Sequence, residues 1–260
     1  MHRFARRLAL VLLAATSGLA HAQFSAQITP PRFEDGAKPG EVYREVIEIS
    51  NIAPTPLRMS VSTADWSLND EGGVAFQASL AEQSCRPWTA LEATRIEVPA
   101  NSKRRFRFEV RVPADADSRQ CRFAVMFEGE PMPMPGVALP VAGRIGVIVY
   151  LDVGDARAQL RVAGSGVVEE GGRQLPMLRI ENTGNAHGRL EGFIDAVDAT
   201  GERWTLAPSG NPILPGMTRD IPLYPVVSDD QPVVLVFPMQ VKGKLEWRGQ
   251  SIDIDATADR

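Results

Sequence analysis

The sequence has few histidines. His2 and His21 lie within the first 22 residues, so His187 is the only histidine in the rest of the chain. One histidine and two cysteines cannot supply the usual ligands of a zinc site. No Gly-x-Ser-x-Gly motif accompanies His187, and the segment 182–185 (NTGN) before it predicts a turn. We therefore expect His187 to be an exposed turn residue, and we expect no metal site, no catalytic group and no enzyme.

Long apolar runs are also missing. The first 22 residues place Arg3, Arg6 and Arg7 before an apolar run at 8–13 and end in small residues, which is typical of a secretory signal peptide cut after Ala22. No other stretch approaches the roughly 20 apolar residues of a membrane-spanning helix. The mature chain is therefore predicted to be exported and to have no membrane span.

Positive charge is in deficit once this segment is removed. Residues 1–22 contain three of the 28 basic residues and none of the 32 acidic ones, which leaves the mature chain with a net charge of −7. Bulk electrostatics therefore disfavour a nucleic-acid partner.

The two cysteines, Cys85 and Cys121, are not arranged as Cys-x-x-Cys, which disfavours a thiol-redox enzyme. In an exported protein an even pair favours a disulfide, which would stabilise the fold by roughly 3 to 4 kcal/mol. Two buried free thiols are the alternative.

Short runs of period-two alternation are abundant, and helical periodicity is almost absent. Such runs occupy residues 46–50, 57–63, 95–98, 106–112 and 122–127, and turn residues separate them. The chain also has 20 prolines and 22 glycines. Many short strands with turns between them predict an all-β sandwich or barrel.

The second half of the chain repeats the first in outline. The run 46–51 (VIEISN) is answered by 177–182 (MLRIEN), so that Asn51 and Asn182 each end an expected strand with Ile-x-Asn. Both asparagines are interpreted as turn residues whose side chains satisfy nearby backbone groups. We expect two β-sandwich domains, one from residue 23 to 152 and one from residue 153 to 260.

Two other groups of residues could suggest a ligand site. Asp253 and Asp255 share one face of an expected strand, but Ile252 and Ile254 favour a final strand with its acidic face in water. The segment 164–166 (GSG) lacks the third glycine of a phosphate-binding loop and is predicted to be a turn.

The segment 131–151 is the longest alternating stretch. After a Pro-Met repeat, apolar and other residues alternate, which predicts a long strand; the apolar positions are Val137, Leu139, Val141, Ile145, Val147 and Val149. A long apolar edge strand is normally blunted in a soluble protein. This strand therefore either pairs inside the protein or forms a surface for another chain.

A signal peptide, two sandwich-like domains and this strand at the end of the first domain resemble the PapD-like family of periplasmic pilus-assembly chaperones. The segment 28–36 (ITPPRFEDG) is similar to the first strand of that family, and Arg32 stands where the family has an arginine in the cleft between its domains. The resemblance covers most of the mature chain and is strongest before Leu151. It implies that both domains are immunoglobulin-like β-sandwiches.

The resemblance implies a set of subunit-binding residues. In this family, alternating apolar residues of the closing strand are donated to a pilus subunit, and the arginine and a lysine hold the C-terminal carboxylate of that subunit. The lysine position is Gly146 in this chain, and Arg144 on the same face is the candidate replacement. The implied site consists of Arg32, Val137, Leu139, Val141, Arg144 and Ile145.

The function implied is that of a periplasmic chaperone, which fills the groove of an incomplete pilin-like subunit by donor-strand complementation and delivers it to an outer-membrane usher. No cofactor is required. Two alternatives are a structural or adhesive surface protein with two immunoglobulin-like domains, in which 131–151 pairs internally, and, least favoured, an exported hydrolase.

Overall fold

The computed structural model describes residues 26–69, 72–131, 139–227 and 233–260. These residues form seventeen strands and one 3-10 helix, η1 (Arg86–Trp88), and they contain no α-helix. None of the described helical residues belongs to a segment long and apolar enough to cross a membrane. The all-β class predicted from the period-two runs is confirmed. The predicted signal peptide lies outside the described residues.

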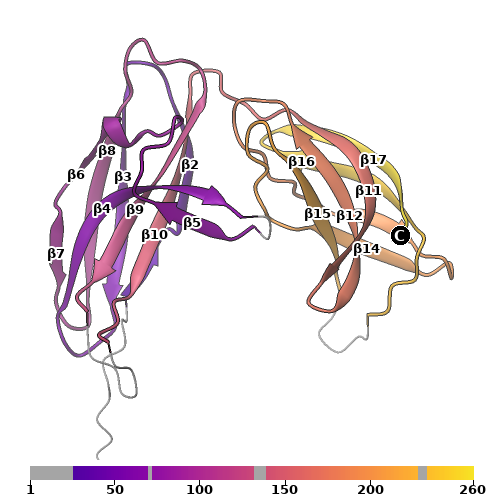
Figure 1. Cartoon of the computed structure of the whole chain (residues 1–260), viewed down its shortest axis with the longest axis horizontal. Helices are drawn as coiled ribbons and strands as arrows, with labels where there is room; N and C mark the ends of the chain where they lie inside the picture. Colours follow the sequence, from indigo (N-terminus) through magenta and orange to yellow (C-terminus); the bar gives the residue numbers. More distant parts are fainter. Residues whose placement is uncertain (1–25, 70–71, 132–138, 228–232) are drawn as a thin grey trace, which may run out of the picture.

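Two sheets form a sandwich in the first half of the chain (Figure 1). The four-stranded sheet has the order β1 (Ala26–Thr29), β3 (Val42–Asn51), β8 (Ser102–Arg111) and β6 (Thr89–Leu91). The other sheet has the order β2 (Arg32–Ala37), β10 (Arg144–Val153), β9 (Gln120–Gly129), β4 (Leu57–Leu68) and β5 (Val74–Gln77), and β7 (Arg95–Val98) also pairs with β4.

Aromatic side chains from both sheets fill this sandwich. Phe106 and Phe108 of β8 meet Phe127 and Phe123 of β9, with ring centroids 5.4 Å and 6.1 Å apart. All four rings are almost completely buried. Because successive side chains of a strand point to opposite faces, the alternation seen in the sequence places these rings in one core.

The predicted pairing of Cys85 with Cys121 is confirmed. The bond joins the residue before η1 to the second residue of β9, across a sequence separation of 36 residues. Both cysteines are fully buried in the core of the first sandwich.

Asn51 and Asn182 act as predicted. Asn51 Nδ2 donates to the backbone oxygens of Thr55 and Val98 at 2.8 and 3.1 Å. Asn182 Nδ2 donates to those of Ala186 and Ile213, both at 2.8 Å. Each asparagine also accepts a backbone N–H two residues further on through Oδ1. Two buried amides therefore close equivalent turns in the two halves.

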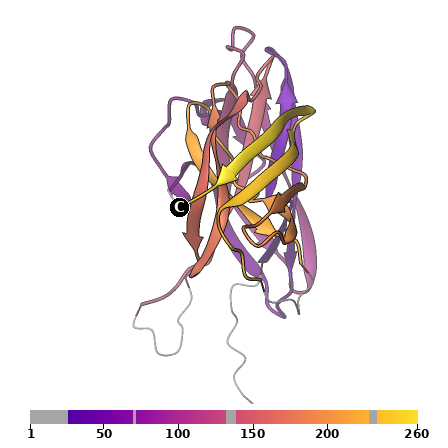
Figure 2. The ribbon, with the colours of Figure 1, turned by 90° about the vertical axis from the view of Figure 1, so that its right-hand side faces the viewer.

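The second half forms a seven-stranded sheet with the order β11 (Leu160–Glu170), β12 (Arg173–Asn182), β15 (Thr218–Pro225), β14 (Arg203–Pro208), β13 (Ile194–Val197), β16 (Met239–Trp247) and β17 (Gln250–Ala258). The sheet curls over its own apolar core, and Figure 2 shows it from the side. The outer strands β11 and β17 come together, where Ser165 Oγ donates to the carbonyl of Thr257 at 2.7 Å. In β17, Asp253 and Asp255 face solvent and Ile254 is buried, as predicted.

The prediction of a turn at 164–166 is wrong. These residues lie inside β11, where the register with β12 shifts between Val162 and Gly164. Gly166 faces Met177, because a Cβ at Gly166 would lie 3.1 Å from Met177 Cε. Gly164 therefore follows a bulge, and Gly166 allows a close approach within the strand.

The predicted boundary between residues 152 and 153 falls at the end of β10. β11 begins seven residues after β10 ends. Separate apolar clusters lie on the two sides of this connection, one formed by residues 33–153 and the other by residues 158–258.

Candidate functional site

β10 has a strand on both sides for only part of its length. On one side, Arg144 to Asp152 pair with β9 in antiparallel fashion. On the other side, β2 pairs with β10 in parallel, and this pairing begins at Arg32 opposite Ile148. Within the described residues, no strand pairs with this second side over 144–147. We call residues 144–147 of β10 the open edge.

The described residues before β2, 26–31, leave the open edge uncovered. β1 pairs with β3 in the other sheet, and Pro30 and Pro31 lie between β1 and β2. Proline has no backbone N–H and cannot donate to a sheet. The chain therefore changes sheets at the point where it would otherwise extend along β10.

Backbone groups of the open edge are directed to its free side. The N–H of Ile148 donates to the carbonyl of Pro31 at 3.2 Å. Backbone groups of successive strand residues alternate between the two edges. The N–H and C=O of Gly146 and Arg144 therefore point to the same side as those of Ile148, where an added strand could bond to them.

The apolar residues along and before this edge become more buried toward the sandwich. Leu139 is 75% exposed and Val141 is 43% exposed, whereas Ile145 is half-buried and Val147 is completely buried. Apolar side chains therefore continue beyond the end of the core. Val137, the first of the predicted apolar donors, lies outside the described residues.

The prediction of one continuous strand through 131–151 is wrong at 139–143, where Val141 forms only an isolated bridge, and residues 132–138 lie outside the described part of the chain. β10 begins at Arg144, and Leu139 to Gly143 do not belong to a strand. Pro140 cannot donate to a ladder, and Gly143 carries no side chain that would favour extended pairing.

An arm formed by the end of β4 and by β5, residues 65–69 and 72–77, crosses the outer face of the larger sheet (Figure 1). Trp66 packs edge-on against Tyr150 of β10 at 5.2 Å between centroids, and its Nε1 donates to the carbonyl of Phe123 at 3.2 Å. The tip of the arm reaches the second half, because a Cβ at Gly72 would lie 3.0 Å from Arg219 Nη2.

Phe76 of this arm lies directly over Gly146. A Cβ at Gly146 would lie 2.4 Å from Phe76 Cζ and 3.0 Å from Met126 Sδ. No side chain fits at residue 146 while Phe76 holds this place. The presence of glycine at the position where the resemblance predicts a lysine is therefore explained by the lack of space beneath Phe76.

Arg144, the predicted replacement for that lysine, also contacts the arm. Its guanidinium carbon lies 5.9 Å from the centroid of the Phe76 ring, within the range of a cation–π interaction. Arg144 is exposed and forms no ion pair in the described part of the chain.

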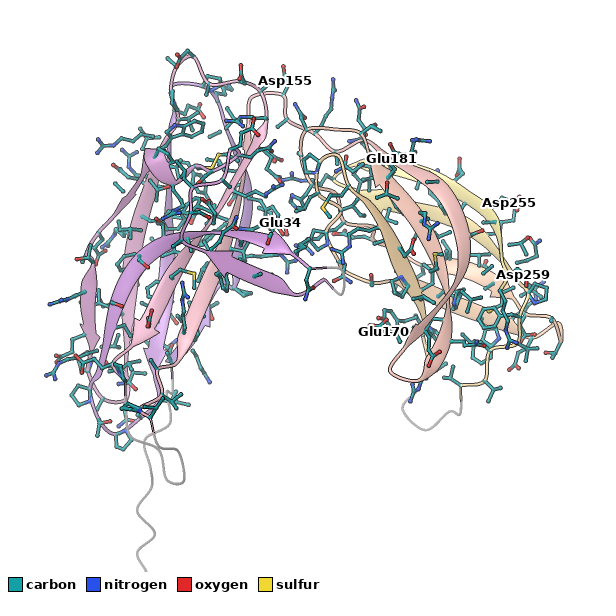
Figure 3. All side chains as sticks on the ribbon, in the orientation of Figure 1. Glu34, Asp155, Glu170, Glu181, Asp255 and Asp259 are labelled. Carbon is teal, nitrogen blue, oxygen red and sulfur yellow. A yellow bond between two sulfur atoms is a disulfide. The ribbon has the colours of Figure 1, made fainter. Side chains whose placement is uncertain are left out.

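Arg32 lies where the open edge begins, and its side chain is 52% exposed. Its Nε donates to Glu34 Oε1 at 2.6 Å. Glu34 lies on the face that is turned toward the second half (Figure 3), and Arg32, two residues earlier on β2, shares that face.

Glu34 is held from the second half of the chain. Arg189 Nε donates to Glu34 Oε1 at 3.0 Å, and His187 Nε2 lies 3.2 Å from Glu34 Oε2. Burial alone would raise the pKa of the Glu34 carboxyl. The hydrogen bond and charge of His187 and the charges of Arg189 and Arg32 outweigh this and lower the pKa to about 2. Glu34 is therefore a fixed carboxylate at neutral pH.

The prediction that His187 is exposed is wrong. The residue is 1% exposed, stacks on Tyr150 at 3.9 Å between ring centroids, and meets Gln120 and Glu34. Gln120 Oε1 accepts the backbone N–H of His187, which leaves Gln120 Nε2 to donate to His187 Nδ1 at 2.7 Å. His187 Nε2 then carries the proton of a neutral ring and donates it to Glu34.

Burial lowers the pKa of His187. The hydrogen bond and charge of Glu34 raise it, and the charges of Arg189 and Arg248 lower it further, so that the pKa lies below its ordinary value. The neutral ring required by the hydrogen bonds is thus also the form favoured at neutral pH.

Sequence reasoning missed Glu34, Phe76 and Arg189. Glu34 had a local signal, since a carboxylate two residues after an arginine on a strand lies on the same face. Phe76 and Arg189 had no local sequence signal, because each reaches the site from a part of the chain that is far away in sequence.

No model of a known protein family matches the sequence, and no curated protein matches it. Solved structures of fimbrial chaperones are similar to it over nearly the whole chain. The YadV chaperone has 12% identity and a TM-score of 0.49, covering 90% of this chain and 99% of that one. The class 5 fimbriae chaperone CfaA has 12% identity and a TM-score of 0.49, covering 89% and 98%. A structure of the Salmonella enterica SafA pilin in complex with the SafB chaperone has 14% identity and a TM-score of 0.47, covering 91% and 98%.

Proposed function

We propose that this protein is a periplasmic chaperone that binds pilin-like subunits along the open edge of β10 and delivers them to an outer-membrane usher. The single observation that carries the proposal is the open edge itself, which lies in line with β2 and is preceded by the exposed Leu139 and Val141. An incomplete sandwich that lacks one strand needs this combination of free backbone groups and apolar side chains.

Arg32 determines the direction of the added strand in this proposal. β2 runs parallel to β10 and begins at Arg32, so a strand along 144–147 would end beside Arg32. A cation at this end favours the C-terminal carboxylate of the partner over its N-terminal amine. The last strand of the subunit would therefore run parallel to β10.

The apolar side chains would supply much of the binding energy. Leu139 and Val141 would each stabilise the complex by roughly 1.5 to 3 kcal/mol if a subunit groove buried them fully. Ile145 would contribute less, because it is already half-buried. Val137 belongs to the same proposed row. Arg144 would contribute to binding through its exposed charge beside Phe76.

The proposal assigns different roles to the two predicted domains. Residues 23–152 would carry the whole donor surface. Residues 153–260 would hold Glu34 through His187 and Arg189, and so would support the region around Arg32. Binding of this kind forms and breaks no covalent bond and needs no cofactor.

Replacing Leu139 with aspartate tests the proposal. We expect a tagged wild-type protein purified from periplasm to carry a small β-rich subunit in stoichiometric amounts. Leu139→Asp should lower subunit binding by about 100-fold or more, because it would place a charge in an apolar groove. Its melting temperature should be unchanged, because residue 139 is exposed.

Leu80→Asp is the matched control. Leu80 is 62% exposed, lies in the loop between β5 and η1, and does not belong to the row of apolar residues before β10. This variant should carry as much subunit as the wild type. A wild-type protein that purifies alone, or a Leu139→Asp variant that still protects a subunit from degradation, would overturn the proposal in favour of a structural or adhesive protein.

A further inference from the structure

Arg32 is only partly occupied by its contact with Glu34. The contact uses Nε, and within the described residues neither terminal nitrogen of Arg32 donates a hydrogen bond to the protein. An arginine has N–H groups on all three of its side-chain nitrogens, arranged in a rigid plane. A contact at Nε therefore leaves both terminal nitrogens available and limits the directions in which they can point.

Glu34 is well suited to hold another side chain in place. Both of its oxygens are bonded, since Oε1 accepts from Arg32 and Arg189 and Oε2 accepts from His187. Arg189 is itself fixed, because it also donates to the carbonyl of Gly210 and, through Nη2 at 3.2 Å, to the hydroxyl of Tyr150. A carboxylate with this many fixed donors moves little when a ligand arrives.

The charges of this group also leave room for one more anion. Arg32 and Arg189 contribute two positive charges, Glu34 contributes one negative charge, and the His187 ring is neutral. The group therefore keeps one unit of positive charge next to the open edge. A second carboxylate can neutralise it without displacing Glu34.

We infer that Glu34 is a positioning residue, which turns the terminal nitrogens of Arg32 toward the open edge so that they receive the C-terminal carboxylate of a partner strand. Arg189 and His187 hold Glu34, so the second half of the chain sets the geometry of an anchor that lies on the first. The inference rests on the proposed function and adds to it the group that orients the anchor. If Glu34 were instead a competitor for Arg32, its removal would strengthen carboxylate binding.

Two short peptides distinguish these possibilities. Both alternate valine and serine and carry an acetyl group at the N-terminus; one ends in a free carboxylate and the other in an amide. Binding is followed by NMR through the backbone amides of the open edge and the Nε–H of Arg32. We expect the wild type to bind the acid about tenfold more tightly than the amide, and Glu34→Ala to lose this preference. Glu34→Gln should keep part of it, because its amide oxygen can still accept from Arg32 Nε.

Arg248→Gln is the control for a general weakening of the contact between the two halves. Arg248 pairs with Asp152 across this contact but does not touch Glu34 or Arg32. The variant should keep the preference for the acid. Adding Glu34→Ala to Arg32→Ala should cause no further loss, because the effect of Glu34 acts through Arg32.

The outcomes separate this inference from the proposed function. If neither peptide shifts the amides of the open edge, the proposed function fails. If both peptides shift them but Glu34→Ala keeps or increases the preference for the acid, strand binding stands and the positioning role of Glu34 is overturned. An equal loss in Arg248→Gln would also overturn it.

Discussion

In the second half of the chain, the outer strands β11 and β17 meet, and Ser165 bonds to the backbone of Thr257. In the first half, β2 covers β10 only from Ile148 onward, and 144–147 have no neighbour on that side within the described residues. Both halves end a strand with Ile-x-Asn, and the asparagine is buried in each. The same Ile-x-Asn pattern therefore occurs in the second half, where the outer strands of the sheet meet, and in the first half, where β10 has an open edge.

The difference arises from the pairing of the first extended segment in each half. Pro30 and Pro31 divide the first extended segment between two sheets, so that neither part follows β10 along its whole length. β11 has no such break and pairs with β12 from Leu160 to Glu170, apart from one bulge. An exposed edge normally invites aggregation. Among the described residues, this unpaired stretch of β10 lies in the first half, where we propose that a subunit binds.

Removing the disulfide should give the largest difference in stability between the two halves. Cys85→Ala with Cys121→Ala should lower the free energy of unfolding of the first half by about 3 to 4 kcal/mol, because the bond closes a loop in the unfolded chain. The second half has no disulfide among its described residues and should be unaffected. Hydrogen exchange followed by mass spectrometry can measure protection in each half. Equal loss in both would mean that they unfold as one unit.

The fit of Phe76 over Gly146 should give an intermediate effect. Gly146→Lys should lower the free energy of unfolding by about 1 to 3 kcal/mol, because its Cβ would clash with the ring. Denaturant unfolding measures the change. In a Phe76→Ala background the same substitution should cost clearly less, since the ring is gone. Additive losses would show that Phe76 does not limit residue 146.

His187 should give the smallest effect, at the contact between the halves. Its pKa is lower in the folded protein, so the unfolded chain binds more protons below about pH 6.5. Stability from the neutral ring is thus present above that pH and is lost as the pH falls. Between pH 7.5 and 5.0 the loss should not exceed about 2 kcal/mol, which is the value for a ring that stays neutral in the folded protein throughout this range. Glu34, with a pKa of about 2, stays ionised in this window.

The measurement is denaturant unfolding at both pH values, with His187→Gln as the comparison. Glutamine does not titrate, so the pH-dependent part of the loss should largely disappear in this variant. If the variant and the wild type lose the same stability between the two pH values, His187 does not control the pH dependence of this contact.

Much of the fold could be predicted from the sequence. Period-two runs predicted the strands, and the run at 95–98 coincides with β7. Turn chemistry predicted the roles of Asn51 and Asn182, and export predicted the pairing of Cys85 with Cys121. These features depend on local backbone preferences or on the redox state of the compartment, so a short stretch of sequence contains the information.

The surroundings of the candidate site were decided by the tertiary structure. His187 follows a turn sequence and is nevertheless buried, because Gln120 and Tyr150 from the first half cover it. Phe76 lies on Gly146 because the arm folds back across the sheet. Arg32 is bonded to a carboxylate that the second half holds. Local periodicity reports which face of a strand is apolar, but it does not say which distant side chain comes to lie against that face.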